Sequence, residues 1–405
     1  MPMFLETLTV ILTAALRVFS LYIVLIAIFC LKRPKPFERA QPKTRFACLV
    51  AARNEELVIG QLVESLRQQN YPDELYDIYV IPNNCTDRTA ECARRAGAKI
   101  FRCIDPVRCK GDALHQVVSW LLPQKYDAFC VFDADNVVDG HFLSRMNDAF
   151  CSGARVAKAS LRVKNPGDSW VSGCYGLYFT LFDTFYNRAR TNCGLSAKLV
   201  GTGFAVHHEV FEKLGGWNTN TIAEDAEFSA QCAALGVRIC YVPEAVTYDE
   251  APVSLRTSLR QRRRWCSGIM TVTERRFKTL VPVLGRKGGL RAFDMIVFLL
   301  GPFVQALSVV PLALAILSAA LKGELCEYVL TAALSLVIAW VGCSVLAAIL
   351  ARIGGYGTTV VKSVMTFPLF MATWLPLQVV SLVRRTYEWK IISHTRGVSV
   401  RELTR

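Results

Sequence analysis

The chain has 405 residues, of which 52% are apolar, and carries a formal net charge of +14 at pH 7. This length accommodates one domain of about 250 residues together with several membrane helices. Composition argues against nucleic acid as a partner, because no nucleic-acid-binding motif is present and the basic residues gather beside hydrophobic stretches, where anionic lipid attracts them.

The first element is an apolar stretch, Leu8–Leu31, which contains one charged residue and is followed by Lys32 and Arg33. It exceeds the roughly 20 residues that a spanning helix needs. It lacks the basic start and the small-residue cleavage site of a signal peptide, so we expect an uncleaved anchor. The basic residues behind it predict a cytosolic location for residues 32–291. The 15 cysteines contain no Cys-x-x-Cys pair, and we expect them to be reduced apolar fillers.

Residues 46–150 alternate between short apolar runs and segments with helical spacing. We predict strands at 46–52, 76–82, 98–102 and 128–132, and helices at 57–69, 88–96 and 111–121. Alternation of this kind implies a mainly parallel sheet in a doubly wound α/β domain. Ligands of such sheets bind beyond the carboxyl ends of the strands, where several polar residues of this chain fall.

From residue 154 the alternation loosens. We predict a strand at 155–163, an aromatic-rich helix at 170–186, a helix that begins near residue 224, and an amphipathic helix at 255–279 lying on the membrane surface. Three more apolar stretches follow, at 293–321, 328–350 and 360–383. Pro368 and Pro376 interrupt the last of them, which we expect to be a broken, re-entrant or interfacial segment. The side of the membrane that holds the basic tail stays open at this point.

Two carboxylates, Asp133 and Asp135, directly follow the predicted strand at 128–132. Such a pair can hold a hard divalent cation whose other ligands are diphosphate oxygens. The cation would then offset the charge that develops on a leaving diphosphate. A short Asp-x-Asp pattern also occurs in ordinary turns and helix caps, but its position at a strand end favours the metal site.

Other polar residues sit at neighbouring positions of the predicted sheet. Lys110 and Gly111 open a helix, where a lysine and free backbone amides would hold phosphate, although a solvated turn is the simpler alternative. Asn83 and Asn84 follow the second strand, where they could bind a nucleobase or ribose, or form a turn before the next helix.

Two further motifs lie nearer the membrane segments. Glu224 and Asp225 begin a predicted helix, so one of them could be a helix cap or a general base for an acceptor hydroxyl. Direct displacement by that hydroxyl would invert the anomeric configuration. The run from Gln261 to Trp265 contains three arginines that could neutralise a diphosphate, and its Trp could underlie a sugar. A basic membrane-surface helix with an interfacial Trp is the alternative.

In this order the motifs resemble those of the membrane-embedded family 2 glycosyltransferases, the group that contains cellulose, hyaluronan, chitin-oligosaccharide and poly-N-acetylglucosamine synthases. The resemblance covers residues 45–279 and agrees with the hydrophobic segments on both sides. It implies a GT-A-like α/β domain at the cytosolic face of the plasma membrane, a nucleotide-sugar donor, and Mg²⁺ or Mn²⁺ as cofactor.

The resemblance also implies roles for individual residues. Asp133 and Asp135 match the metal-binding pair, and Asp225 matches the last residue of the Thr-Glu-Asp motif, the expected catalytic base. Trp265 matches the aromatic residue beneath the acceptor sugar, and the turn Gly201-Thr202-Gly203 matches a loop close to the acceptor. The residues that match donor-binding positions are Ala52, Arg53, Glu55, Asn83, Lys110, Gly111, Asp133, Gln261, Arg262 and Arg264.

The chain departs from the family pattern at three positions. Ala51 replaces a proline of the first loop, Asn83 replaces an aspartate that contacts the base or ribose, and Ala223 replaces the threonine of the base motif. Asparagine can still hydrogen-bond a uracil edge, so these changes make the donor nucleotide less certain without removing the expected base.

These observations favour an inverting, metal-dependent enzyme that adds a hexose or N-acetylhexosamine from a nucleotide sugar, UDP-linked by preference, to a growing polysaccharide, with export or regulatory subunits as further partners. Transfer of one sugar to a lipid acceptor is the alternative, and a non-catalytic nucleotide-sugar-binding scaffold is a third hypothesis. The expected organisation is an anchor at 1–35, a catalytic domain at 43–252, an interface helix at 253–291, transmembrane helices at 292–385 and a basic tail at 386–405.

Overall fold

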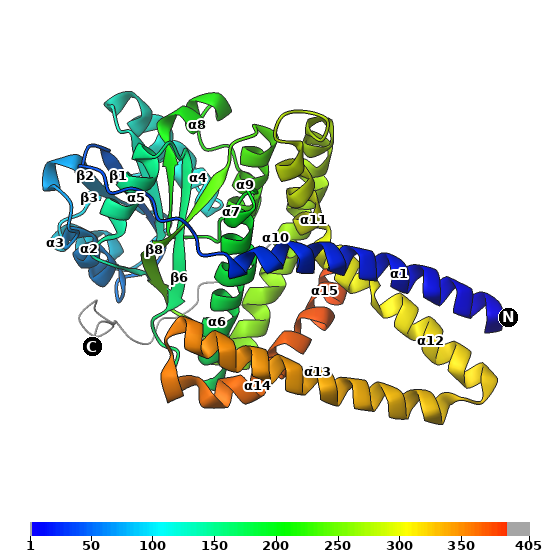
Figure 1. Cartoon of the computed structure of the whole chain (residues 1–405). Coiled ribbons are helices and arrows are strands. Elements are labelled where there is room, and N and C mark those ends of the chain that lie inside the picture. Colours follow the sequence, from blue (N-terminus) through cyan, green and yellow to red (C-terminus); the bar gives the residue numbers. More distant parts are fainter. Residues whose placement is uncertain (1, 387–405) are drawn as a thin grey trace.

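One mixed sheet organises the computed structural model, which describes residues 2–386 (Figure 1). Within these residues eight strands follow the order β3-β2-β1-β4-β7-β6-β8-β5. The strands are β1 (Phe46–Ala52), β2 (Tyr76–Pro82), β3 (Lys99–Ile100), β4 (Ala128–Asp133), β5 (Val137–Val138), β6 (Val156–Val163), β7 (Phe204–His207) and β8 (Ile239–Asp249). The predicted GT-A-like, mainly parallel arrangement is confirmed.

The sheet register brings the ends of three strands to one edge. β1 pairs in parallel with β2 and β4, so Ala52 lies beside Pro82 and Ala51 beside Asp133. β7 runs antiparallel to β4 and starts at this same edge, where Phe204 pairs with Val131. These central strands are nearly continuous apolar runs because helices cover both faces of the sheet.

Helices complete two apolar layers on the sheet. α2, α3 and α5 cover one face, and α4, α8 and α9 cover the other. The α-helices are α1 (Pro2–Ala27), α2 (Ile59–Arg67), α3 (Thr89–Arg95), α4 (Lys110–Leu121), α5 (Phe142–Cys151), α6 (Trp170–Leu181), α7 (Ala189–Asn192), α8 (His208–Leu214), α9 (Glu224–Ala234), α10 (Leu255–Leu280), α11 (Gly289–Leu307), α12 (Val309–Lys322), α13 (Leu325–Gly354), α14 (Val361–Ala372) and α15 (Trp374–Val383). Short 3₁₀ turns lie at Ile28–Leu31, Asp73–Leu75, Leu122–Gln124, Val281–Val283 and Gly357–Val360.

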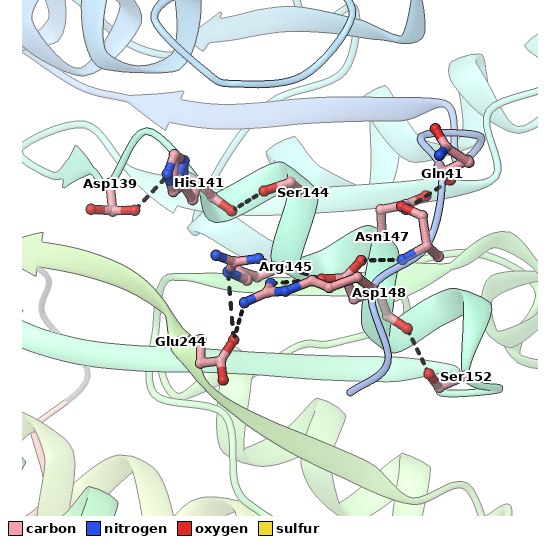
Figure 2. A network of polar contacts seen from close by, with 11 residues as sticks. Gln41, Asp139, His141, Ser144, Arg145, Asn147, Asp148, Ser152 and Glu244 are labelled. Atoms are coloured by element: carbon pink, nitrogen blue, oxygen red, sulfur yellow. Dashed lines mark hydrogen bonds and ion pairs between the residues drawn. The ribbon is translucent and has the colours of Figure 1, made fainter. Parts of the chain in front are cut away.

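The linker that leaves α1 is fastened to the outer side of the domain by α5. Asp148 accepts hydrogen bonds from the Arg39 guanidinium and the Ala40 amide, both at 3.0 Å. Asn147 donates to the carbonyl of Gln41 at 3.2 Å, and Arg145 bridges Asp148 to Glu244 of β8 (Figure 2). Side chains of α5 therefore hold residues 39–41 of the linker against the domain.

The predicted aromatic-rich helix is present but changes its winding. Ser169 caps the N-terminus of α6, because its hydroxyl accepts a hydrogen bond from the Ser172 amide. After Leu181 the helix continues as a π-helical segment, η4 (Phe182–Arg188). Asp183 in this segment accepts hydrogen bonds from the Leu161 amide at 2.9 Å and the Ser160 hydroxyl at 3.0 Å. The wide turn thus joins the helix to β6.

The N-terminal helix and the helices after residue 254 fall into two groups. In Figure 1, α1, α12 and α13 extend away from the sheet, whereas α10, α11, α14 and α15 lie beside the domain. Helical segments Met3–Leu31, Gly289–Lys322, Leu325–Gly354 and Gly357–Val383 are long and apolar enough to cross a membrane. The amphipathic helix predicted at 255–279 is α10, which packs against α9, α11 and α15.

The last apolar stretch is broken, as its prolines predicted. α14 ends at Ala372 and α15 starts at Trp374 in a new direction (Figure 1). The chain then returns to α10, because the carbonyl of Arg384 accepts a hydrogen bond from Arg263 at 3.0 Å and the Thr386 amide donates to Ser267 at 3.2 Å. Beyond that amide, the predicted basic tail lies outside the described residues.

Candidate active site

The loops after β1 and β2 are bound to each other at the active edge of the sheet. The main-chain and side-chain amides of Asn83 both donate to the carbonyl of Ala52, at 2.9 and 3.1 Å. Asn54, which has a φ of 58°, accepts a hydrogen bond from the Thr86 amide at 2.8 Å. Arg53 and Glu55 lie partly exposed on this loop. The first predicted donor-binding residues therefore share one rigid loop pair.

Lys110 is the centre of the site. Its ammonium lies 2.5 Å from the Asp133 carboxylate and 3.6 Å from that of Glu224, and it donates to the carbonyl of Gly201 at 2.7 Å. Burial opposes the charge on this amine, but the two carboxylates raise the pKa of Lys110 above its ordinary value. Next to it, a Cβ on Gly111 would lie 2.6 Å from the Thr219 hydroxyl, so close packing requires glycine there.

Asp225 faces the same cluster from the first turn of α9. Its carboxylate accepts hydrogen bonds from the amides of Gly201 and Ala226, both at 2.7 Å. The neighbouring Glu224 is also in the site, because its carboxylate lies 3.6 Å from the Lys110 ammonium. Burial and the repulsion of nearby acids raise the pKa of Glu224 to about 7, against the attraction of Lys110. Sequence reasoning left both a cap and a base open for the pair Glu224–Asp225 and assigned only Asp225 to the site.

The turn 201–203 wraps around Asp133. Gly201 and Gly203 have φ values of 62° and 64°, and a Cβ on Gly201 would lie 3.4 Å from the Asp133 carboxylate. The Thr202 hydroxyl accepts a hydrogen bond from the Asp133 amide at 3.1 Å and contacts Asn136. The positive φ values favour glycine at both positions. The turn thus links the predicted metal pair with Asp225.

The end of β8 adds a third carboxylate that sequence reasoning missed. Asp249 accepts a hydrogen bond from Asn136 at 3.0 Å, and burial together with repulsion from Asp135 and Asp133 raises its pKa well above the ordinary value. Its position at a strand end was the available signal. Lys164 donates to the carbonyl of Asp135 at 2.9 Å from the same side.

Carboxylate oxygens are the ligands that Mg²⁺ and Mn²⁺ prefer, and Asp133, Asp135 and Asp249 lie close enough to repel one another, so these residues fit such a cation. A separate group of three potential metal ligands, His207, His208 and Glu209, lies within residues 2–386 at the end of β7, away from these carboxylates. Asp133 and Asp135 alone do not make a complete cage, which agrees with a site that needs donor oxygens as further ligands.

The motif on α10 is divided between two environments. The Gln261 carboxamide accepts a hydrogen bond from the Tyr175 hydroxyl at 2.8 Å, and Trp265 lies edge-on to Tyr175 with ring centroids 6.0 Å apart. Trp265 also stacks on Trp374, at 6.3 Å. Arg264 is partly exposed and makes no hydrogen bond or ion pair with the described residues, so it is the arginine of this run that is free to meet a ligand.

Arg262, which was predicted to be a donor ligand, packs against α14. Its side chain is fully buried, donates to Ser258 at 3.2 Å and to the carbonyl of Phe370 at 3.0 Å, and stacks 4.0 Å from the Phe370 ring centroid. These contacts hold the guanidinium against Phe370 of α14. The structure therefore brings together Lys110, Asp133, Asp225 and the turn 201–203, and leaves Arg262 outside that group.

A family model described as glycosyltransferase like family 2 matches residues 42–268, which include all of these loops. The chain belongs to glycosyltransferase family 2. This family 2 glycosyltransferase is 30% identical over 247 residues to the probable glycosyltransferase YdaM of Bacillus subtilis, across 58% of this chain and 57% of the relative. It is 27% identical over 277 residues to a beta-monoglucosyldiacylglycerol synthase of Nostoc, across 65% and 56%.

The glycosyltransferase is also 25% identical over 225 residues to the poly-beta-1,6-N-acetyl-D-glucosamine synthase of Staphylococcus aureus, across 54% of this chain and 53% of the relative. The matches thus span little more than half the length of these relatives. Among solved structures, the mannosyltransferase PcManGT of Pyrobaculum calidifontis, in complex with GDP-Man and Mn²⁺, superposes with a TM-score of 0.61 and 21% identity, across 93% of this chain and 99% of that one. This likeness shows a shared fold that includes the C-terminal helices.

Proposed function

We propose that this glycosyltransferase moves a hexose or N-acetylhexosamine from a nucleotide sugar, UDP-linked by preference, to a lipid acceptor with inversion at the anomeric carbon. The observation that carries the proposal is that Gly201 contacts both Lys110 and Asp225. Its carbonyl binds Lys110, which pairs with Asp133, and its amide binds Asp225. A donor diphosphate held at Asp133 would therefore place its sugar within reach of the Asp225 carboxylate.

In this proposal each residue of the chain has a separate task. Lys110 supplies positive charge to the diphosphate, and Arg264 lies free to add a bidentate contact. Asp225 takes the proton from an acceptor hydroxyl as its oxygen attacks the anomeric carbon. Asp133 and Asp135, with Asp249 behind them, would hold Mg²⁺ or Mn²⁺, which when bound neutralises charge on the departing diphosphate. Trp265 offers its ring to the acceptor.

The helices beyond α10 favour a lipid acceptor over a polymer that crosses the membrane. Residues 333–342 of α13 are exposed on every face of the helix, which suits a segment surrounded by lipid better than one lining an enclosed path. α12 packs on α1, and α13 packs on α6 and α14. The glucosyldiacylglycerol synthase among the relatives supports the same acceptor class. Polysaccharide elongation remains the second candidate, favoured by the poly-N-acetylglucosamine synthase.

We also propose a cytosolic catalytic domain on a multi-pass plasma-membrane protein. α1, the α11–α12 segment and α13 would cross the membrane, while α14 and α15 stay beside the domain. The return of residues 384–386 to α10 supports this arrangement. It would put Arg384 and Arg385 on the same side as Lys32 and Arg33, in agreement with the positive-inside rule.

Product analysis tests the proposed function. Protein purified in detergent would receive radiolabelled nucleotide sugars, each with diacylglycerol, an anionic lipid or an oligosaccharide primer. We expect one labelled sugar per lipid in the organic phase, and no label there with Asp225→Asn. Long glycosidase-sensitive chains without labelled lipid would refute the lipid acceptor and favour the polymer synthase.

A further inference from the structure

Two adjacent histidines stand at the end of β7 that lies away from the catalytic turn 201–203. His207 and His208 are two of the five histidines in the chain, and Glu209 follows them. One ligand atom from each of these three side chains lies within 4.8 Å of the other two. The four residues of β7 separate the group from the turn 201–203 by about 13 Å, at about 3.3 Å for each residue of a strand. The group is therefore not part of the catalytic site.

The backbone explains why these consecutive side chains meet. His207 ends β7 with extended dihedral angles, φ −69° and ψ 142°, and α8 begins at the next residue. The change from strand to helix leaves the two imidazoles side by side, with ring centroids 4.5 Å apart. The amide of His207 donates to the carbonyl of Arg155, and that of His208 to the carbonyl of Asp127, both at 2.9 Å. Bonds to the residues that precede β6 and β4 thus hold both histidines on a rigid part of the sheet.

The donor atoms of this group are arranged as metal ligands require. Nδ1 of His207 lies 3.9 Å from one carboxylate oxygen of Glu209, and the other oxygen accepts a hydrogen bond from Arg155 at 2.8 Å. Nδ1 of His208 lies 2.8 Å from the carboxylate of Glu212, one turn along α8. A carboxylate of this kind commonly orients the ring of a ligating histidine. Burial, together with the neighbouring His208, lowers the pKa of His207, so this imidazole is neutral and keeps a lone pair at pH 7.

Imidazole nitrogens distinguish this group from the carboxylates at the catalytic edge. Oxygen ligands alone favour Mg²⁺ and Mn²⁺, whereas two imidazoles with one carboxylate favour Zn²⁺. Ligand atoms around tetrahedral Zn²⁺ lie about 3.3 Å apart, so the three atoms need to close by at most about 1.5 Å. The side chains of His207, His208 and Glu209 are 16%, 32% and 38% exposed. They can therefore rotate by this amount, and an ion can reach them from water.

We propose that His207, His208 and Glu209 form a second metal site, which binds Zn²⁺ with water as the fourth ligand. The ion would join the end of β7 to the first turn of α8, a helix that covers one face of the sheet. In Figure 1, α8 lies at the upper margin of the domain, away from α12 and α13, so the site faces water rather than the bilayer. The bound ion would stabilise the domain and take no part in sugar transfer.

Zinc titration of the full-length protein in dodecyl maltoside tests the site. The protein is treated with chelator and then kept in excess Mg²⁺, which competes at oxygen-only sites, while calorimetry records the binding of Zn²⁺. Wild-type protein should show a binding component that His208→Gln weakens about tenfold or more, because the variant lacks one of three protein ligands. His141→Gln removes an exposed histidine just before α5 and is the matched control, which should bind as the wild type does. Asp135→Ala, which alters the other candidate metal site, should also keep this component.

Two further readouts separate the site from the 15 cysteines of the chain. Co²⁺ in place of Zn²⁺ should give the visible bands of tetrahedral nitrogen and oxygen ligation, without the near-ultraviolet charge-transfer band of a thiolate ligand. Zn²⁺ at about 100 times its dissociation constant should raise the Tm of the wild type by about 5–10 °C, and that of His208→Gln much less. In chelator the two proteins should unfold at the same temperature.

The outcomes decide the proposal without any measurement of turnover. A wild-type protein that binds no Zn²⁺ in the presence of Mg²⁺ overturns the site whether or not the variants fold. Equal Zn²⁺ affinity of the wild type and His208→Gln overturns it too, and a thiolate band with Co²⁺ would assign the ion to cysteines instead. Because none of these measurements uses a sugar donor or an acceptor, the metal site and the proposed function stand or fall separately.

Discussion

Removal of the Lys110 ammonium tests the proposed metal site. In the variant Lys110→Met, Asp133 and Glu224 would lose their cation and repel each other. Lys99→Met is the matched control, because Lys99 pairs with Asp77 at 2.6 Å on the domain surface, away from the catalytic edge. Both variants remove a lysine that pairs with an aspartate, and Lys110 differs in also lying 3.6 Å from Glu224.

The expected losses of folding free energy follow from the solvent exposure of the paired side chains. Breaking a fully buried ion pair costs about 3–5 kcal/mol. The side chains of Lys110 and Asp133 are 18% and 40% exposed, so solvent screens part of that cost and we expect a loss of about 1–3 kcal/mol without metal. Lys99 is 58% exposed, and its loss should stay below about 1 kcal/mol. For a domain of this size each kcal/mol shifts the Tm by about 2–4 °C.

Thermal unfolding in detergent, monitored by tryptophan fluorescence, measures the loss of stability when chelator is present and the stabilisation by metal when Mn²⁺ is present. Mn²⁺ should raise the Tm of Lys110→Met more than that of the wild type, because no ammonium competes for Asp133. About tenfold tighter metal binding would add about 1.4 kcal/mol of stability. Lys99→Met should respond to Mn²⁺ as the wild type does. An equal Mn²⁺ response in all three proteins would refute the reasoning that Lys110 and the cation share one carboxylate.

Three further predictions concern the base, the metal pair and the membrane contact. Asp225→Asn should lower sugar transfer at least about 10²-fold while nucleotide affinity, measured by calorimetry, persists; unchanged turnover would remove the proposed base. Asp135→Ala should abolish the part of donor binding that chelator removes from the wild type, and normal cation-dependent binding would contradict the metal role. Arg190→Met should cost about 3–5 kcal/mol, because it strands the buried Asp294 carboxylate that lies 2.8 Å from the guanidinium. The double variant with Asp294→Asn should regain part of the lost Tm, and a stable single variant would count against that ion pair.

The sequence predicted the strands of the sheet well, because each strand is marked by an apolar run within its own residues. β1 is an uninterrupted apolar run and β2 is interrupted only by Asp77, and both strands occupy the predicted residues, 46–52 and 76–82. The position of Asp133 at the active edge followed from the strand that precedes it. The broken last segment was also predictable, since proline removes a backbone donor wherever it occurs.

What the sequence could not predict depends on partners far along the chain. Helical periodicity places Arg262 on one face of α10, but its partner Phe370 lies more than 100 residues later and decides its orientation. Asp249 ends a strand whose neighbours come from other parts of the sheet, so its closeness to Asp135 is a property of topology. The π-helical turn at Phe182–Arg188 has no short sequence signature.

One contact joins the loop before Asp225, the proposed base, to a helix that packs on a segment long and apolar enough to cross a membrane. Gly268 of α10 lies so close to the loop before Asp225 that a Cβ added there would be 2.7 Å from the Ala223 methyl group. α10 also packs on α11, which continues into a hydrophobic segment. A thinner or thicker bilayer that tilts this segment would press on Ala223 through α10, and the Asp225 carboxylate beside it would shift. The catalytic rate of this enzyme should therefore depend on the acyl-chain length of the surrounding lipid.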